Sequence, residues 1–133
     1  ANGGILYKPT LIKGAKPIIY GKAKINPENL ENVKKGLFGV VNEPSGTGWA
    51  SRSSLTNIAG KTGTAQVVSS KKGQYYSEKF RDHAWFVAFA PMEKPEIALS
   101  VLVEHGGHGG TTAAPIAKTA IEAYMKSARS LDR

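Results

Sequence analysis

The sequence predicts an α+β domain in which helices pack on an antiparallel sheet. Three observations support this class. Apolar residues recur at helical spacing over residues 27–42, three strand-like runs follow between residues 58 and 104, and a second helical pattern closes the chain. The 133 residues, 41% of them hydrophobic, are enough for one modest domain with a core, and no internal repeat divides them.

The first third of the chain combines extended segments with one well-marked helix. Ala1–Gly4 ("ANGG") has the Asn and Gly of a helix C-terminal cap, which predicts that a helix precedes it. Ile5–Ile12 is typical of an extended segment interrupted by proline, and a connection follows. Asn26, as an N-cap before a proline, then begins a predicted amphipathic helix over residues 27–42.

Three strands are predicted after a Gly/Ser-rich loop: Ile58–Val68, His83–Ala90 and Glu96–Glu104. A polar stretch, Ser69–Asp82, separates the first two. The last two are joined by a short proline-bearing turn, which predicts an antiparallel hairpin. Their nearly continuous apolar character predicts that both faces of the hairpin are covered.

A closing helix follows the glycine-rich turn "HGGHGG" at His105–Gly110. Thr111 or Thr112 is its expected N-cap, and a proline stands in its first turn. Its predicted apolar side consists of Ala113, Ala117, Ala120, Ile121, Tyr124 and Ala128.

Composition excludes several classes of function. The chain has no cysteine, so a disulfide scaffold, a thiolate metal site and a cysteine nucleophile are excluded. The net charge is +8, and residues 1–41 hold seven lysines against two glutamates. These lysines are spread out with few aromatic residues between them, so we expect no nucleic-acid binding and favour a solvated basic face. Attraction to anionic lipid or to an acidic cell-surface polymer is a further possibility that charge alone leaves open.

The stretch "IAGKTGTAQVV" places Lys61 beside two hydroxyls and a glycine, a composition that binds anions. A nucleotide-binding phosphate loop requires a glycine where the chain has Leu55 and a helix where residues 65–68 continue as strand. We therefore reject a nucleotide site. The remaining candidate is the Lys-Thr-Gly triplet of penicillin-recognising serine enzymes, which lies on an edge strand beside the active-site cleft.

The residue types suit that position. Lys61 supplies a positive charge for a carboxylate and favours a nearby hydroxyl as a proton carrier. The hydroxyls of Thr62 and Thr64 are candidates to hydrogen-bond the same carboxylate, and Gly63 leaves room for a substrate backbone. The Thr64 N–H is a candidate donor of an oxyanion hole. Lys61 and Thr64 are thus the candidate catalytic residues.

The residues around the triplet carry a family resemblance. "GTGWAS", "IAGKTGTAQVV", "DHAWFVAFAP" and "ALSVLVEHGGHGGTTAAPIAKTAIEAY" resemble, in order and spacing, the C-terminal part of class B penicillin-binding proteins, most closely their elongation-type penicillin-binding protein 2 subfamily. The resemblance implies a serine β-lactamase-like transpeptidase domain on the periplasmic face of the bacterial inner membrane. It also implies a cell-shape function, cross-linking of peptidoglycan stem peptides, acylation by β-lactam antibiotics, and elongation-machinery proteins as partners.

The chain lacks two motifs that this chemistry requires. Ser-x-Asn does not occur, and Ser-x-x-Lys occurs once, at Ser69–Lys72, in a polar loop on the wrong side of Lys-Thr-Gly. We therefore expect residues 1–133 to be the C-terminal portion of one transpeptidase domain, inactive alone and completed by the N-terminal part of the same protein. A non-catalytic cell-wall interaction module with a transpeptidase-like shell is the alternative. A β-lactamase-like hydrolase is a weaker one.

Other conspicuous residues receive structural interpretations. His105 and His108, with Glu104, are too few ligands for zinc or nickel, so we predict no metal and no cofactor. Asp82 and His83 are expected to fix the start of a strand rather than to act as a catalytic dyad. Trp85, Phe86 and Phe89 are expected in the core and cleft wall, and Trp49 at the edge of the site.

Overall fold

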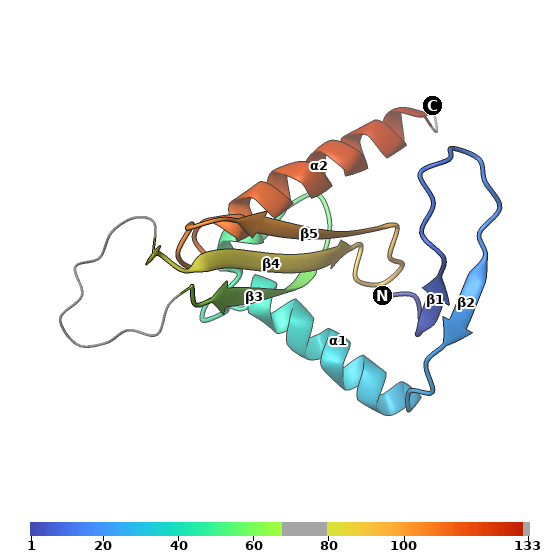
Figure 1. Cartoon of the computed structure of the whole chain (residues 1–133), viewed down its shortest axis with the longest axis horizontal. Coiled ribbons are helices and arrows are strands. Elements are labelled where there is room, and N and C mark those ends of the chain that lie inside the picture. Colours follow the sequence, from blue (N-terminus) through green and yellow to red (C-terminus); the bar gives the residue numbers. More distant parts are fainter. Residues whose placement is uncertain (68–79, 132–133) are drawn as a thin grey trace.

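The computed structural model describes residues 1–67 and 80–131 and confirms the α+β class (Figure 1). In chain order, the elements are β1 (Ile5–Tyr7), β2 (Ile19–Lys22), α1 (Pro27–Asn42), the short 3-10 helix η1 (Trp49–Ser51), β3 (Ala59–Ala65), β4 (His83–Ala90), β5 (Ile97–Val103) and α2 (Ala113–Leu131). β1 and β2 form a separate antiparallel pair. The central sheet has the strand order β3-β4-β5, with both pairings antiparallel.

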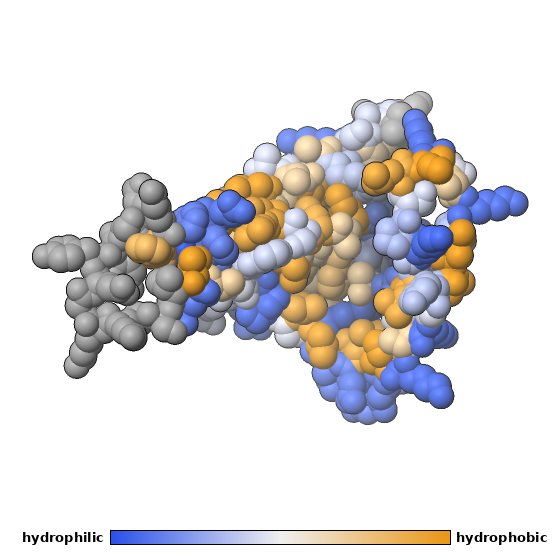
Figure 2. All heavy atoms as spheres, viewed as in Figure 1, coloured by the Kyte–Doolittle hydropathy of each residue, from blue (hydrophilic) through white to orange (hydrophobic). Residues whose placement is uncertain are grey.

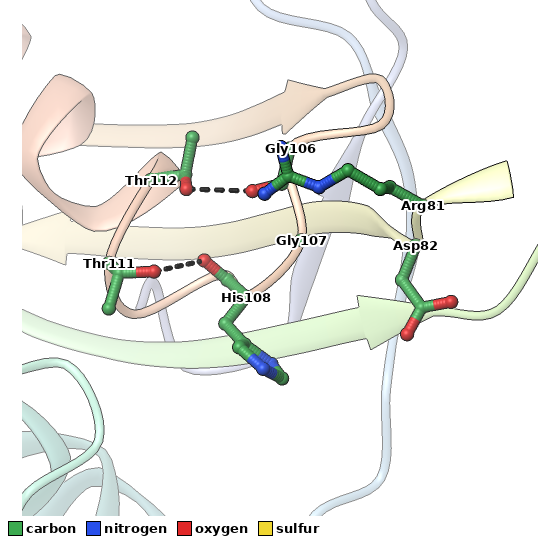
Figure 3. Close-up of a pocket in the computed structure, with 7 residues that line it drawn as sticks. All are labelled: Arg81, Asp82, Gly106, Gly107, His108, Thr111 and Thr112. Atoms are coloured by element: carbon green, nitrogen blue, oxygen red, sulfur yellow. Dashed lines mark hydrogen bonds between the residues drawn. The ribbon is translucent and has the colours of Figure 1, made fainter. Parts of the chain in front are cut away.

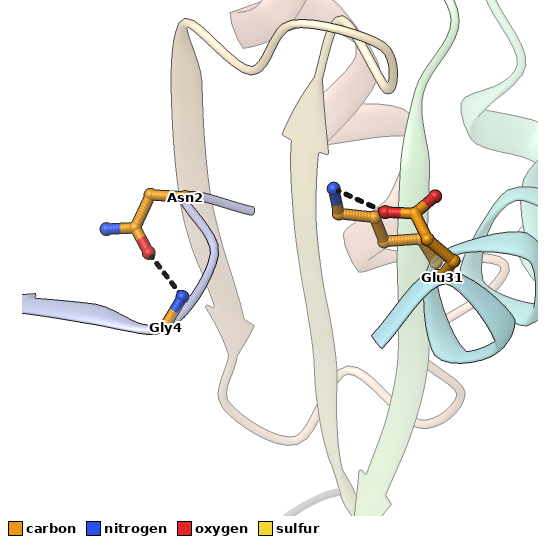
Figure 4. A network of polar contacts seen from close by, with 4 residues as sticks. Asn2, Gly4 and Glu31 are labelled. Atoms are coloured by element: carbon orange, nitrogen blue, oxygen red, sulfur yellow. Dashed lines mark hydrogen bonds and ion pairs between the residues drawn. The ribbon is translucent and has the colours of Figure 1, made fainter. Parts of the chain in front are cut away.

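Helix α1 begins and ends where the sequence predicts. The Asn26 side-chain oxygen accepts hydrogen bonds from the backbone N–H groups of Glu28 (2.8 Å) and Asn29 (3.3 Å), as expected of an N-cap. Within the helix, the largely covered side chain of Lys34 forms an ion pair with the exposed Glu31 at 3.2 Å (Figure 4). The C-terminal end meets the sheet beside β3, because the Asn42 amide donates to the Ile58 carbonyl (2.9 Å).

The opening residues form a tight turn into β1. The Asn2 side-chain oxygen accepts from the N–H groups of Gly4 and Ile5, and Gly3 and Gly4 have φ values of +76° and +88° (Figure 4). The helix that we expect before Ala1 concerns residues outside the sequence and stays a prediction. The extended segment Ile5–Ile12 is shorter than predicted, since β1 ends at Tyr7.

One face of the central sheet forms the core. Ala84, Phe86, Ala88 and Ala90 of β4 are buried in a cluster with side chains of both helices. Alternate residues of β4 and β5 point to the opposite, open face of the sheet. On that face Trp85 is exposed by 38%, Val87 by 47% and Leu102 by 44%, whereas Phe89 is buried. We predicted that both faces of the hairpin are covered, but the described residues cover only one of them. Figure 2 shows apolar residues gathered over the sheet.

The buried stripe of α2 differs in part from the prediction. Ala113, Ala117 and Ile121 are buried as expected, but Ala120 is exposed and Tyr124 is 39% exposed. Met125 is buried in their place, since it follows Ile121 by four residues and therefore lies on the same side of the helix. Within residues 1–67 and 80–131, no helix combines the length and apolar character needed to cross a bilayer.

The predicted capping of α2 by a threonine hydroxyl is also not what the structure shows. Thr111 Oγ1 donates to the His108 carbonyl (3.1 Å), and Thr112 Oγ1 donates to the Gly106 carbonyl (2.8 Å). Both hydroxyls therefore bind the loop that precedes the helix. The Gly109 carbonyl accepts from the N–H groups of Ala113 and Ala114 and begins the helical hydrogen bonding.

Candidate active site

The Lys-Thr-Gly triplet lies on β3, which is an edge strand of the central sheet as the structure describes it (Figure 1). One side of β3 pairs with β4, and its other backbone edge is not paired with a described strand. Lys61 is exposed, and its Nζ donates to the Thr62 carbonyl at 2.7 Å. No described acidic residue forms an ion pair with Lys61, so its positive charge is available to an anion.

The two threonines beside Lys61 differ in their surroundings. Thr62 Oγ1 is hydrogen-bonded to Thr47 Oγ1 at 2.8 Å, whereas Thr64 is exposed. Side chains alternate along a strand, so Thr62 and Thr64 share one face while Lys61 points to the other. A single carboxylate can meet Lys61 and both hydroxyls only at the free edge of β3. The candidate site is therefore an edge rather than a sheet face.

Two glycines shape this strand. A Cβ on Gly60 would lie 2.6 Å from Cζ of Phe86, so only a glycine at this position lets the buried phenyl ring pack against the backbone of β3. A Cβ on Gly63 would lie 3.1 Å from Cβ of Trp85, its partner on β4. Gly63 therefore avoids a tight contact with Trp85. The predicted assignments of Phe86 and Phe89 to the core are confirmed, and Trp85 lies on the open face.

The loop between β5 and α2 packs directly on β3. A Cβ on Gly109 would overlap the Trp85 carbonyl oxygen and lie 2.6 Å from the Gly63 carbonyl oxygen. A Cβ on Gly110 would overlap the Thr47 carbonyl oxygen and lie 3.5 Å from Thr62 Cγ2. Gly109 and Gly110, the last two glycines of "HGGHGG", are therefore required for close backbone approach, as the sequence indicated.

The histidines of this region hold the loop in place. His105 has a left-handed backbone (φ +54°), and its N–H donates to His83 Nδ1 at 2.9 Å. A ring nitrogen of His105 also lies 3.1 Å from the Arg81 carbonyl. His83 thus fixes the start of β4, which confirms its structural interpretation. Among the described residues, no three His, Asp or Glu side chains gather as a metal site.

A pocket of about 360 Å³ opens at the end of β3, where this loop faces the residues before β4 (Figure 3). Its lining residues are Arg81, Asp82, Gly106, Gly107, His108, Thr111 and Thr112. Sequence reasoning missed Arg81, because only the fold brings it against a glycine-rich turn 25 or more residues away. The available signal was a cation two residues before a predicted strand.

Two further features that the sequence indicated are Trp49 and the Ser-x-x-Lys match. Trp49 is 39% exposed, and the Arg52 guanidinium lies 4.8 Å from the centroid of its ring. Its place at the edge of the site stays a prediction. Ser69–Lys72, the single Ser-x-x-Lys match, lies outside the described residues.

Comparison with known proteins shows the family. The model of the penicillin-binding protein transpeptidase domain matches residues 1–122, so the chain belongs to that family. Peptidoglycan D,D-transpeptidase MrdA of Acinetobacter baumannii is 41% identical over 94% of this chain and 20% of its own length. The chain spans about a fifth of the length of the curated relatives it matches.

Solved structures agree with the assignment. Penicillin-binding protein 2 of Pseudomonas aeruginosa, in complex with WCK 5153, is 37% identical, with a TM-score of 0.67 over 83% of this chain and 23% of that chain. Penicillin-binding protein 2 of Helicobacter pylori, in complex with MreC, is 35% identical, with a TM-score of 0.60 over 81% of this chain and 21% of that chain. The fold and the order of the elements are therefore those of transpeptidase domains.

Proposed function

We propose that this chain is the C-terminal portion of a peptidoglycan D,D-transpeptidase that cross-links stem peptides by serine acyl transfer and is acylated by β-lactams. The observation that carries the proposal is the Lys-Thr-Gly triplet on the free edge of β3, with Lys61 exposed, in a chain that belongs to the transpeptidase family. The relative from A. baumannii is named a peptidoglycan D,D-transpeptidase, which supports this activity for the whole protein.

The proposed chemistry divides between this chain and upstream residues. Lys61 binds the terminal carboxylate of the substrate and favours proton transfer by a hydroxyl, while Thr62 and Thr64 hydrogen-bond the carboxylate. Gly63 admits the substrate backbone, and the Thr64 amide donates to the tetrahedral oxyanion. The nucleophile comes from upstream, where Ser-x-x-Lys and Ser-x-Asn belong. The chain alone is inactive because a nucleophile and its base act as a unit.

The open face of the sheet supports the proposal that upstream residues complete the active site. Trp85, Val87 and Leu102 are each more than a third exposed, and they lie beside Lys61 and Gly63 in the strand register. Contiguous exposed apolar surface marks an interface. We assign this face to contact with the N-terminal part of the same domain, which would bring the upstream serine to the edge of β3.

Partners and location extend the proposal to the whole protein. The relative from H. pylori was solved with MreC, which supports an elongation-machinery protein as a partner here as well. We propose the periplasmic face of the inner membrane as its location, since cross-linking of peptidoglycan and a function in cell shape would take place there; any anchor would lie outside residues 1–133.

The test is a pair of lysine substitutions in the longer protein, made of this chain joined to its upstream residues. Lys61→Gln should lower the second-order rate constant of acylation by benzylpenicillin on the order of a hundredfold, since it removes the charge that binds the carboxylate. Lys94→Gln, in the exposed turn between β4 and β5, is the matched control and should leave the rate unchanged. Equal rates for both variants would refute the assignment of Lys61. A wild-type protein that takes no penicillin would instead favour a non-catalytic module.

A further inference from the structure

We propose that Thr47, in the loop between α1 and η1, is a positioning residue that orients the Thr62 hydroxyl toward the substrate carboxylate. The inference rests on the proposed transpeptidase function, and it assigns a role to a residue outside the Lys-Thr-Gly triplet. Thr47 Oγ1 lies 2.8 Å from Thr62 Oγ1, although the two residues are 15 positions apart in the sequence. Thr47 therefore acts through Thr62 rather than on the substrate itself.

Backbone contacts to α1 fix the place of Thr47. The Gly46 N–H donates to the Glu43 carbonyl at 2.8 Å, and the Gly48 N–H donates to the Val40 carbonyl at 2.9 Å. A Cβ on Gly46 would overlap the Val40 carbonyl oxygen, so the loop passes too close to the helix for a side chain at that position. These contacts involve no atom of the Thr47 side chain. The loop therefore presents the Thr47 hydroxyl to β3 without depending on it.

The glycine-rich loop before α2 supports the same pair of threonines. A Cβ on Gly110 would overlap the Thr47 carbonyl oxygen and lie 3.5 Å from Thr62 Cγ2. The Thr62 side chain thus has the Thr47 hydroxyl beside its oxygen and Gly110 near its methyl group. Three segments that are distant in the sequence meet at this pair of hydroxyls, and together they hold it in place at the Lys61 edge.

The number of protons decides which hydroxyl donates when a substrate is bound. A hydroxyl has one proton to donate, and a carboxylate only accepts. Thr62 can donate to the carboxylate and keep its bond to Thr47 only if its oxygen accepts the proton of Thr47. In the free protein either hydroxyl can be the donor. In the bound state the chain therefore runs from Thr47 to Thr62 to the carboxylate, and each hydrogen bond polarises the next.

The second threonine of the edge, Thr64, provides a comparison within the same site. Thr64 is exposed, and within residues 1–67 and 80–131 its hydroxyl has no such neighbour. An unsupported hydroxyl loses rotational freedom when it binds, so Thr62 starts from the better-ordered position. Loss of the Thr47 hydroxyl should therefore weaken the contact that Thr62 makes with the carboxylate and leave the contact of Thr64 unchanged.

The test is a double-mutant cycle on the longer protein, measured as the second-order rate constant of acylation by benzylpenicillin. Thr47→Val removes the hydroxyl, keeps the shape, and should lower the rate constant about fivefold, as for loss of one neutral hydrogen bond. Thr62→Val should lower it about tenfold or more, because its bond to the carboxylate is charge-assisted. In the Thr62→Val background, Thr47→Val should change the rate constant by less than about twofold, because its partner hydroxyl is gone.

Three further measurements control the design. In the Thr64→Val background, Thr47→Val should again lower the rate constant about fivefold, since these two residues act independently. Thr47→Ser keeps the hydroxyl and should stay within about twofold of the wild type. Thr119→Val removes an exposed hydroxyl that donates to the Pro115 carbonyl (3.1 Å) on α2, and it should leave the rate constant unchanged. Thermal melting checks that each variant is folded, and Thr47→Ala replaces Thr47→Val in the cycle if the valine variant does not fold.

The outcomes separate this inference from the proposed function. A loss in Thr47→Val that disappears in the Thr62→Val background and persists in the Thr64→Val background supports the positioning role. An unchanged rate constant in Thr47→Val, or an effect of the same size in both backgrounds, refutes the role while the transpeptidase assignment stands. If benzylpenicillin does not acylate the wild-type protein, the proposed function fails and the positioning role fails with it.

Discussion

The packing of the glycine-rich loop on β3 makes a sharp prediction about Gly109. Gly109→Ala introduces a methyl group that overlaps the Trp85 carbonyl oxygen and lies 2.6 Å and 3.0 Å from the carbonyl oxygen and nitrogen of Gly63. All three neighbours are backbone atoms of paired strands, so none can rotate away. The loop itself must move, and the carbonyl of Gly109 moves with it.

The expected cost follows from these contacts. Forcing an extra carbon into a well-packed site costs about 1–3 kcal/mol. Displacing the Gly109 carbonyl also weakens its bonds to the N–H groups of Ala113 (3.0 Å) and Ala114 (2.9 Å), and each such bond contributes about 1 kcal/mol. We therefore expect Gly109→Ala to lower the free energy of unfolding by about 3 kcal/mol.

Urea unfolding followed by circular dichroism measures the change, and Gly36→Ala is the matched control. Gly36 lies inside α1, and an added Cβ there would meet no atom within 4 Å. The same substitution should therefore stabilise the protein by about 0.5–1 kcal/mol, because alanine favours the helix. Equal stability of the Gly109→Ala variant and the wild type would refute the close packing of loop and strand.

Two other predictions concern stability and charge. Asn26→Ala removes the N-cap of α1 and should lower the free energy of unfolding by about 1 kcal/mol in the same urea experiment. The control Asn29→Ala should change the free energy of unfolding little. Equal losses in the two variants would argue against the cap. The hydrogen bond from the Asn57 amide lowers the pKa of Glu93 below its ordinary value. Its small contribution to stability is therefore present above the unfolded-state pKa and is lost as the pH falls through the lower folded-state pKa. Asn57→Ala should raise the Glu93 pKa in an NMR titration, and an unchanged pKa would contradict the assigned cause.

Local signals account for the elements that were predicted correctly. The bounds of α1 follow from the Asn26 cap, the adjacent proline and the apolar spacing, all of which act within one or two turns. β4 was likewise predicted with the bounds the structure gives, since its apolar run ends at a proline. Lys61–Thr64 was identifiable for the same reason, because the residues of the motif are contiguous.

Features that depend on long-range packing were not predictable. The hydroxyls of Thr111 and Thr112 bind the preceding loop because that loop folds back against β3, which no local pattern indicates. The exposure of Tyr124 depends on how α2 is rotated on the sheet. The Arg81 pocket depends on contact between residues 81 and 107. In each case the deciding neighbours are distant in the sequence.

The most direct test of the account is to locate the penicilloyl group on the longer protein after reaction with benzylpenicillin, by peptide mapping and mass spectrometry. We predict one adduct, on a serine upstream of Ala1, and none on residues 1–133. This result would show that the chain supplies the Lys61 wall of an active site whose nucleophile lies elsewhere in the protein. An adduct on Ser69 or on any other serine of this chain would contradict the account.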